Sequence, residues 1–169
     1  MTKLDDRVAL VTGGGTGIGR GIALALAQEG ARVVVCGRRQ APLDETVQAI
    51  WEIGGGATAV SADISVAADV ARVIQSTLDT YGTIDILVNN AGTGGGSPIH
   101  EHDIEAWDRI LATNLRGPFL MSRGVLPVMR AYQRGHIINI SSESGLEHYA
   151  GDGPCGVSKH ALNALGEYI

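Results

Sequence analysis

Three side chains that could take part in proton transfer lie near the end of the sequence: Ser142, Cys155 and Lys159. Cys155 and Lys159 are four residues apart, so in a helix they would share one face. An ammonium group beside a thiol favours the thiolate, and we therefore expect Lys159 to lower the pKa of Cys155. Cys155 is then either a reactive thiol or a small residue that fills buried space, and the sequence leaves both interpretations open.

A glycine-rich segment near the N-terminus has the composition of a phosphate-binding turn. It reads Thr12-Gly13-Gly14-Gly15-Thr16-Gly17-Ile18-Gly19, follows the apolar run Val8–Val11 and precedes a helical pattern. Glycines let the backbone approach a phosphate, and the free N–H groups of a helix N-terminus stabilise its charge. The alternative is a glycine turn without a ligand. We predict a pyrophosphate site made by Gly13, Gly15, Thr16, Gly17, Ile18 and Gly19.

Two arginines follow the second apolar run. A site that selects NAD(H) places a carboxylate here, on the ribose 2′-hydroxyl, but the sequence has Gly37, Arg38 and Arg39. Guanidinium groups can instead bind a 2′-phosphate through charge-assisted hydrogen bonds. The sequence therefore favours NADP(H) over NAD(H), with two merely solvated arginines as the alternative.

The order of several motifs carries a family resemblance. The glycine segment has the form T-G-x-x-x-G-I-G, Asn89-Asn90-Ala91-Gly92 follows the fourth apolar run, and Ser142 and Lys159 come at matching distances. From about Arg7 to its last residue the chain resembles the short-chain dehydrogenase/reductase family. The resemblance implies cofactor contacts at Asp63, Ile64, Asn90, Ala91, Gly92 and Lys159. Without it, Asp63 would be interpreted as a helix cap or an Asx turn.

The resemblance also implies a catalytic set with one member missing. Asn114, Ser142 and Lys159 match the family's asparagine, serine and lysine, but the tyrosine position, four residues before the lysine, is Cys155. A phenol oxygen reaches several ångströms farther from its Cα than a thiol sulfur, and a misplacement of about 1 Å can cost roughly a hundredfold in rate. We expect turnover to be impaired unless another acid, for which Tyr149 is the nearest candidate, replaces the phenol.

Two functions follow from these residues. The first is an NAD(P)-dependent oxidoreductase that transfers hydride between the nicotinamide and a small alcohol or carbonyl substrate, impaired in this chain. The second is a non-catalytic nucleotide-binding or assembly protein derived from the same family. The resemblance implies a homo-oligomer in either case.

The apolar pattern predicts the elements that position these residues. Buried β-branched runs alternate with amphipathic stretches, which indicates an α/β fold with a parallel sheet between two helical layers. The predicted fold is Rossmann-like and doubly wound, with strand order 3-2-1-4-5 in one domain, residues 1–169, that lacks the C-terminal part. The fifth strand would then be an open apolar edge. The predicted strands are Val8–Val11, Arg32–Cys36, Ala57–Ser61, Ile84–Asn89 and His136–Ser141; the predicted helices are Ile18–Glu29, Leu43–Ile53, Ala67–Tyr81, a long helix within Ile104–Tyr132, and Pro154–Ile169.

Composition excludes several classes of partner. The 169-residue chain has a formal net charge of -5, which disfavours nucleic acid and anionic membrane surfaces. Cys36 and Cys155 have no paired-ligand spacing, and His100-Glu101-His102-Asp103 lacks supporting ligands, so no metal site is expected. With no signal peptide or membrane span in the sequence, we expect a cytoplasmic protein.

Overall fold

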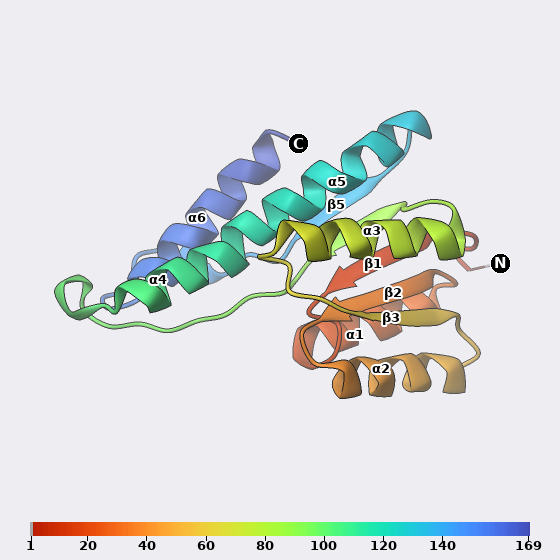
Figure 1. Cartoon of the computed structure of the whole chain (residues 1–169), viewed down its shortest axis with the longest axis horizontal. Coiled ribbons are helices and arrows are strands. Elements are labelled where there is room, and N and C mark those ends of the chain that lie inside the picture. Colours follow the sequence, from red (N-terminus) through yellow and green to blue (C-terminus); the bar gives the residue numbers. More distant parts are fainter. Residues whose placement is uncertain (1) are drawn as a thin grey trace.

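Five parallel strands form the centre of the protein, as the apolar pattern predicts. The structure is a computed structural model that describes residues 2–169 (Figure 1). The sheet order is β3-β2-β1-β4-β5, and each neighbouring pair is parallel. This confirms the predicted Rossmann-like order. The strands are β1 (Val8–Thr12), β2 (Arg32–Gly37), β3 (Ala57–Ser61), β4 (Ile86–Asn89) and β5 (His136–Asn139).

Four strand boundaries differ from the prediction, and β1 and β2 each end one residue later than predicted, at Thr12 and Gly37. β4 begins at Ile86 instead of Ile84, and β5 ends at Asn139 instead of Ser141. The last pair between these strands joins Asn89 to Asn139. Beyond Asn89 the chain turns away from the sheet, so β5 has no partner strand to continue along on that side.

The helices follow the strands in the expected alternation. They are α1 (Gly17–Gln28), α2 (Gln40–Glu52), α3 (Ala67–Tyr81), α4 (Ile104–Leu111), α5 (Gly117–Ala131) and α6 (Gly153–Glu167), with 3-10 turns η1 (Ile99–Glu101) and η3 (Glu143–Gly145). α2 begins three residues before the predicted start at Leu43, because Pro42 fits the first turn of a helix. The long helix predicted within Ile104–Tyr132 is interrupted by a π-helical turn, η2 (Ala112–Arg116).

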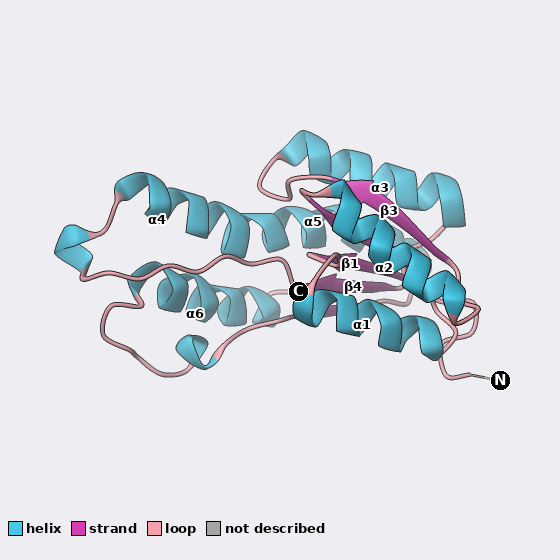
Figure 2. Ribbon diagram, turned by 90° about the horizontal axis from the view of Figure 1, so that it is seen from below, coloured by secondary structure: helices cyan, strands magenta, loops and turns pink. Residues whose placement is uncertain are grey.

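The sheet separates two apolar layers. Ala9, Val11 and Val35 face the layer formed with α1 and α2, whereas Leu10 and Leu87 face the layer that includes Met121 and Val125 of α5. Alternate side chains of a strand point to opposite faces, so both faces of β1 are buried. α1 and α2 cover one face, and α3 and α5 cover the other (Figures 1 and 2).

α4, η2 and α6 extend beyond the ends of the strands. Figure 2 shows α4 and α6 side by side, with the glycine-containing chain that follows β4 running between them. Gly96 of this segment approaches the backbone of Gly151 so closely that a Cβ atom would collide with it. The extension therefore brings the residues after β4 next to the start of α6.

β5 lies at one edge of the sheet. Ile138 is 45% exposed, and within residues 2–169 β5 pairs only with β4. Among these residues, no strand covers this partly apolar edge. No described helix has the length and apolar character required to cross a bilayer.

Candidate nucleotide-binding and catalytic site

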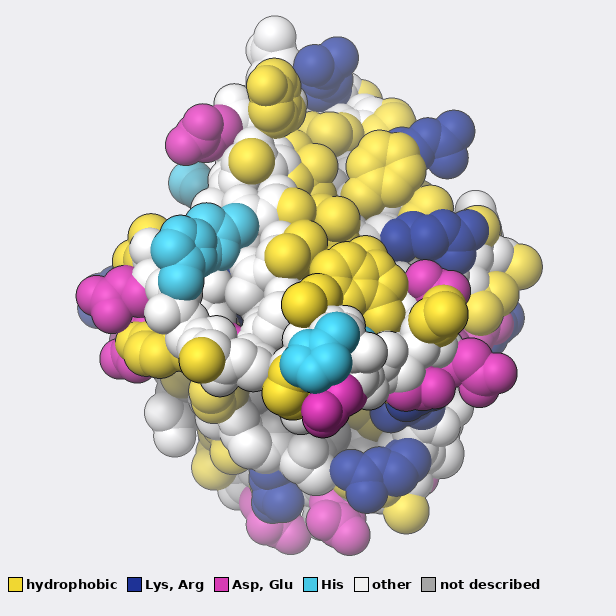
Figure 3. Space-filling model, turned by 90° about the vertical axis from the view of Figure 1, so that its left-hand side faces the viewer, with side chains coloured by type: hydrophobic (Ala, Val, Ile, Leu, Met, Phe, Trp, Pro, Cys, Tyr) yellow, Lys and Arg dark blue, Asp and Glu magenta, His cyan; other side chains and the backbone are white. Residues whose placement is uncertain are grey.

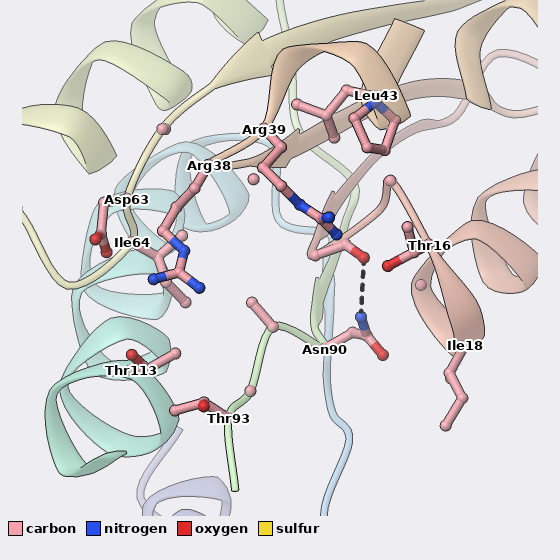
Figure 4. A pocket seen from close by; sticks show the side chains of 18 residues that line it. Thr16, Ile18, Arg38, Arg39, Leu43, Asp63, Ile64, Asn90, Thr93 and Thr113 are labelled. Carbon is pink, nitrogen blue, oxygen red and sulfur yellow. Dashed lines mark hydrogen bonds between the residues drawn. The ribbon is translucent and has the colours of Figure 1, made fainter. Parts of the chain in front are cut away.

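A pocket of about 310 Å³ lies against the segments that follow β1, β2, β3 and β4 (Figure 4). Carboxyl ends of parallel strands share one edge of a sheet, which is where ligands bind in open α/β folds. Of the residues predicted to bind a cofactor, the pocket brings together Gly13, Gly15, Thr16, Ile18, Gly19, Arg38, Arg39, Asp63, Ile64, Asn90, Ala91 and Gly92, but not Gly17 or Lys159. Thr93 and Thr113 also line it, and sequence reasoning missed both.

The glycine turn leaves a helix N-terminus facing this pocket. Gly13 and Gly17 have φ angles of 66° and 53°, which a residue with a Cβ adopts only under strain. A Cβ on Gly19 would collide with the carbonyl of Gly13, so glycine at this position permits the close packing of α1 on the turn. The Thr16 side chain makes no capping hydrogen bond, although it occupies the N-cap position. The first N–H groups of α1 therefore remain available to an anion.

A buried threonine joins the glycine turn to the residues after β4. The Thr12 hydroxyl lies 3.2 Å from the carbonyl oxygen of Val88 and accepts hydrogen bonds from the backbone N–H groups of Asn90 and Ala91, each at 3.0 Å. Asn90 Nδ2 donates to the carbonyl of Thr12 at 3.0 Å. These bonds fix the N-N-A-G segment beside the glycine turn.

The two arginines extend over the pocket. Figure 4 shows the side chain of Arg38 on the side of Asp63 and that of Arg39 on the side of Thr16. Both residues are exposed, and neither guanidinium group forms a salt bridge with an acid of residues 2–169. Two uncompensated positive charges beside a helix N-terminus suit a ligand with several phosphates.

Asp63 forms a local turn as well as part of the pocket wall. One carboxylate oxygen accepts hydrogen bonds from Ser65 N at 2.9 Å and from Ser65 Oγ at 2.7 Å. This is the Asx turn that the sequence allowed as the alternative. The turn orders the chain after β3. Both hydrogen bonds go to the same carboxylate oxygen of Asp63, so its second oxygen takes no part in them.

Lys159 is buried where the segments after β4 and β5 meet. It is 9% exposed, and its ammonium group donates to the carbonyl of Ile140 at 2.6 Å. A Cβ placed on Gly92 would lie 3.9 Å from Nζ, so Lys159 adjoins the N-N-A-G segment without lining the pocket itself. Burial lowers the pKa of Lys159, because desolvation disfavours its charged form.

Asn114 connects the segment after β4 to α6. Its Oδ1 accepts from Thr93 N at 2.8 Å, and its Nδ2 donates to the carbonyl of Thr93 at 2.9 Å and to Ser158 Oγ at 3.1 Å. The side chain is buried in the π-helical turn η2. Its amide is therefore occupied by bonds that position Thr93 and α6.

Lys159 lowers the pKa of Cys155 as expected, but other effects are larger and the pKa is raised overall. Burial raises the pKa of the thiol most, the negative charge of Asp152 raises it further, and Lys159 opposes both with a smaller effect. Sequence spacing identified Lys159 but missed Asp152, which precedes α6 and lies three residues before Cys155. The available signal was an acid three residues before Cys155, just ahead of the predicted helix.

Ser142 and Tyr149 form hydrogen bonds with residues other than Cys155. Ser142 is exposed, and its hydroxyl accepts from Ser144 N at 3.3 Å as it caps η3. The Tyr149 hydroxyl donates to the Glu147 carboxylate at 3.2 Å. This bond directs the phenol towards Glu147, which does not support the role of Tyr149 as a replacement acid.

The histidine segment before α4 makes local contacts. His100 approaches the Glu101 carboxylate at 3.4 Å, and His102 Nδ1 lies 2.7 Å from Ser97 Oγ. Across the described part of the chain, no three His, Cys, Asp or Glu side chains gather as a metal ion would require.

Comparison with known proteins identifies the family. The sequence model described as short chain dehydrogenase matches residues 7–168. The chain belongs to the short-chain dehydrogenase family. An uncharacterized oxidoreductase of Staphylococcus epidermidis is 36% identical to it over 165 residues, covering 98% of this chain and 70% of the relative. Another from Thermotoga maritima is 38% identical over 163 residues, covering 96% of this chain and 64% of the relative.

A solved structure of the same family has the same fold. It is the crystal structure of a metagenomic short-chain oxidoreductase in complex with NADP, with a TM-score of 0.94 and 40% sequence identity. The match covers 98% of this short-chain dehydrogenase chain and 75% of that chain. The family consists of oxidoreductases that bind nicotinamide cofactors, so this general class applies to the protein.

Proposed function

We propose that the chain binds NADP(H) in the pocket at the carboxyl ends of β1 and β4 and belongs to an enzyme that interconverts a small alcohol and its carbonyl compound. The observation that carries the proposal is the convergence of the glycine turn, two unpaired arginines and the N-N-A-G segment on one pocket. The cofactor, when bound, supplies or accepts the hydride, and the protein supplies orientation and the proton.

The residues present fit each charged part of NADP. The first amides of α1 lack a side-chain cap and would receive the pyrophosphate. Arg38 and Arg39 would bind the 2′-phosphate, and no carboxylate replaces them to select the 2′-hydroxyl of NAD. Lys159, beside Gly92, would hold the ribose next to the nicotinamide. NADP(H) is favoured over NAD(H) for these reasons.

Cys155 limits the proposed chemistry. Carbonyl reduction requires a proton donor within hydrogen-bond reach of the developing oxyanion. The thiol is shorter than the phenol whose position it occupies, and burial and Asp152 raise its pKa. We propose that proton delivery is impaired in this chain while Asn114, Ser142 and Lys159 retain the rest of the arrangement.

The same cysteine favours a second candidate, a nucleotide-binding protein without turnover. The glycine turn, the two arginines and the N-N-A-G segment line the pocket, whereas Cys155 does not. Loss of proton transfer would therefore leave cofactor binding intact. The two candidates differ only in whether hydride reaches a carbonyl compound.

Replacing Cys155 with tyrosine separates the candidates. We expect Cys155→Tyr to oxidise NADPH in the presence of a panel of small ketones and aldehydes at least about a hundredfold faster than the parent chain. Cys155→Phe is the matched control, since it supplies the ring without the hydroxyl. Turnover by the tyrosine variant alone supports the reductase. A tyrosine variant that binds NADPH but matches the phenylalanine variant in rate contradicts the reductase and supports the non-catalytic protein.

A further inference from the structure

Thr46 of α2 contacts the glycine turn through its side-chain hydroxyl. Its side chain is fully buried. The hydroxyl oxygen lies 3.0 Å from the carbonyl oxygen of Gly14, 3.4 Å from that of Gly15 and 3.0 Å from that of Pro42. A threonine in a helix commonly donates to the carbonyl four residues earlier, which here is that of Pro42. The carbonyls of Gly14 and Gly15 belong instead to the glycine turn, a separate segment.

These contacts orient two peptide groups of the turn. In a planar trans peptide the C=O and the N–H point in opposite directions. Because the carbonyls of Gly14 and Gly15 approach Thr46, the N–H groups of Gly15 and Thr16 point away from it. Both residues line the pocket. The contact with Thr46 is thus suited to hold these donors on the ligand side of the turn.

The surrounding packing restricts the turn to this position. A Cβ on Gly14 would lie 2.7 Å from Val35 Cγ1, and one on Gly15 would lie 3.1 Å from Pro42 Cβ. Asn90 Nδ2 also donates to the carbonyl of Thr12 at 3.0 Å. The turn is therefore held both by the segment after β4 and by α2.

We propose that Thr46 is a positioning residue for the pyrophosphate: its buried hydroxyl has a single proton, which it donates to the carbonyl of Gly14, with that of Gly15 close by, and so holds the turn with the neighbouring amides facing the ligand. The inference rests on the proposed dinucleotide site, and it adds to that site a residue that does not line the pocket. It assigns Thr46 to the part of the cofactor that NAD and NADP share, and Arg38 and Arg39 to the part in which they differ.

The test compares ligands that contain different phosphates. Thr46→Val removes the hydroxyl with almost no change of shape, and we expect it to weaken binding of NAD+ and NADP+ by the same factor, about threefold to tenfold. Binding of 2′-AMP, which lacks the pyrophosphate, should not change. Dissociation constants would be measured by calorimetry on the purified chain.

Two control variants separate positioning from general destabilisation. Thr46→Ser keeps the hydroxyl and should bind both dinucleotides like the parent. Thr77→Val removes a hydroxyl that is equally buried in a helix, where it donates to Val73 one turn earlier, but Thr77 does not line the pocket. It should lower the melting temperature without changing the affinity for either dinucleotide.

The outcomes distinguish this inference from the proposed function. If the parent chain binds the dinucleotides and Thr46→Val binds them equally well, Thr46 does not position the pyrophosphate. A Thr46→Val variant that loses affinity for 2′-AMP by the same factor also overturns the proposal, because the defect is then general. If the folded parent chain binds neither dinucleotide, it is the proposed function that fails.

Discussion

Cys155, Asp152 and Lys159 show how neighbours decide the chemistry of one position. The ammonium group favours the thiolate, but burial and the carboxylate together outweigh it and raise the pKa of the thiol. The side chain is only partly buried, so reagents can reach it. The thiol should be predominantly protonated at neutral pH and should react slowly.

Alkylation kinetics test this account of Cys155. Below its pKa, the thiolate fraction of a cysteine increases about tenfold per pH unit, and the reaction with iodoacetamide follows that fraction. The rate should therefore keep rising with pH beyond the ordinary range of thiol ionisation. Asp152→Asn removes the negative charge, lowers the pKa and should accelerate alkylation at neutral pH by roughly threefold.

Two further variants should alkylate more slowly than the parent chain or not at all. Lys159→Met removes the charge that lowers the pKa and should slow the reaction. Cys155→Ser should leave the native protein unlabelled, because Cys36 is fully buried and burial raises its pKa to about 12. An Asp152→Asn variant that reacts no faster than the parent would refute the assigned role of Asp152.

Residues that act through sequence-local patterns could be predicted, and residues that act through tertiary contacts could not. The glycine turn and Arg38 follow directly after strands, so their meeting at one sheet edge was foreseeable. Thr46 contacts a turn about 30 residues earlier, and its sequence position carries no signal of that contact. The effect of Lys159 on the pKa of Cys155 has the predicted sign, but helical spacing does not reveal the burial that raises the pKa overall.

At the scale of elements, the N-terminus of α1 carries the proposed anion site. No acidic residue lies in its first turn, and Thr16 does not cap it. Ile18 is 67% exposed at this end and lines the pocket. An uncapped helix start with an exposed apolar side chain is less stable than a capped one, which is consistent with a site kept open for a ligand.

Replacing Ile18 with aspartate should separate stability from binding. A carboxylate in the first turn interacts favourably with the helix dipole by about 0.3–1 kcal/mol, so the melting temperature without ligand should rise by roughly 1–4 °C. The same charge would repel the pyrophosphate and should weaken NADP+ binding about tenfold or more. Differential scanning fluorimetry and calorimetric titration measure the two effects.

Ile18→Asn is the control for this substitution, since it has nearly the same size as aspartate without the charge. It should bind NADP+ more tightly than Ile18→Asp at low salt, and added salt should reduce the difference between them. Equal affinities of the two variants at low salt would show that the α1 N-terminus does not face a phosphate.

Element types and order were predictable because buried parallel strands and amphipathic helices have different apolar periods. The π-helical turn η2 was not predictable, because its residues continue the helical pattern on both sides. Its position is explained only by the structure, in which Asn114 reaches the backbone of Thr93. The boundaries of β4 and β5 likewise depend on their mutual pairing.

At the scale of the whole molecule, parallel strand order brings distant segments together. β1 and β4 are adjacent although 73 residues lie between Thr12, the last residue of β1, and Ile86, the first residue of β4; Ala9 pairs with Ile86. Apolar side chains also form a band on the face at the α4 and α6 end (Figure 3). A hollow beside α5 and α6 is lined by residues that include Phe119, Leu126, Leu165, Tyr168 and Ile169; the homo-oligomer implied by the family resemblance stays a prediction.

Calorimetric titration of the parent chain with NADP+ and NAD+ tests the central claim most directly. The account predicts that both dinucleotides bind with a stoichiometry of one per chain, and that NADP+ binds more tightly than NAD+. The Arg38→Ala variant should lose roughly tenfold in affinity for NADP+ and change little in affinity for NAD+. Folded protein that associates with neither dinucleotide would contradict the account.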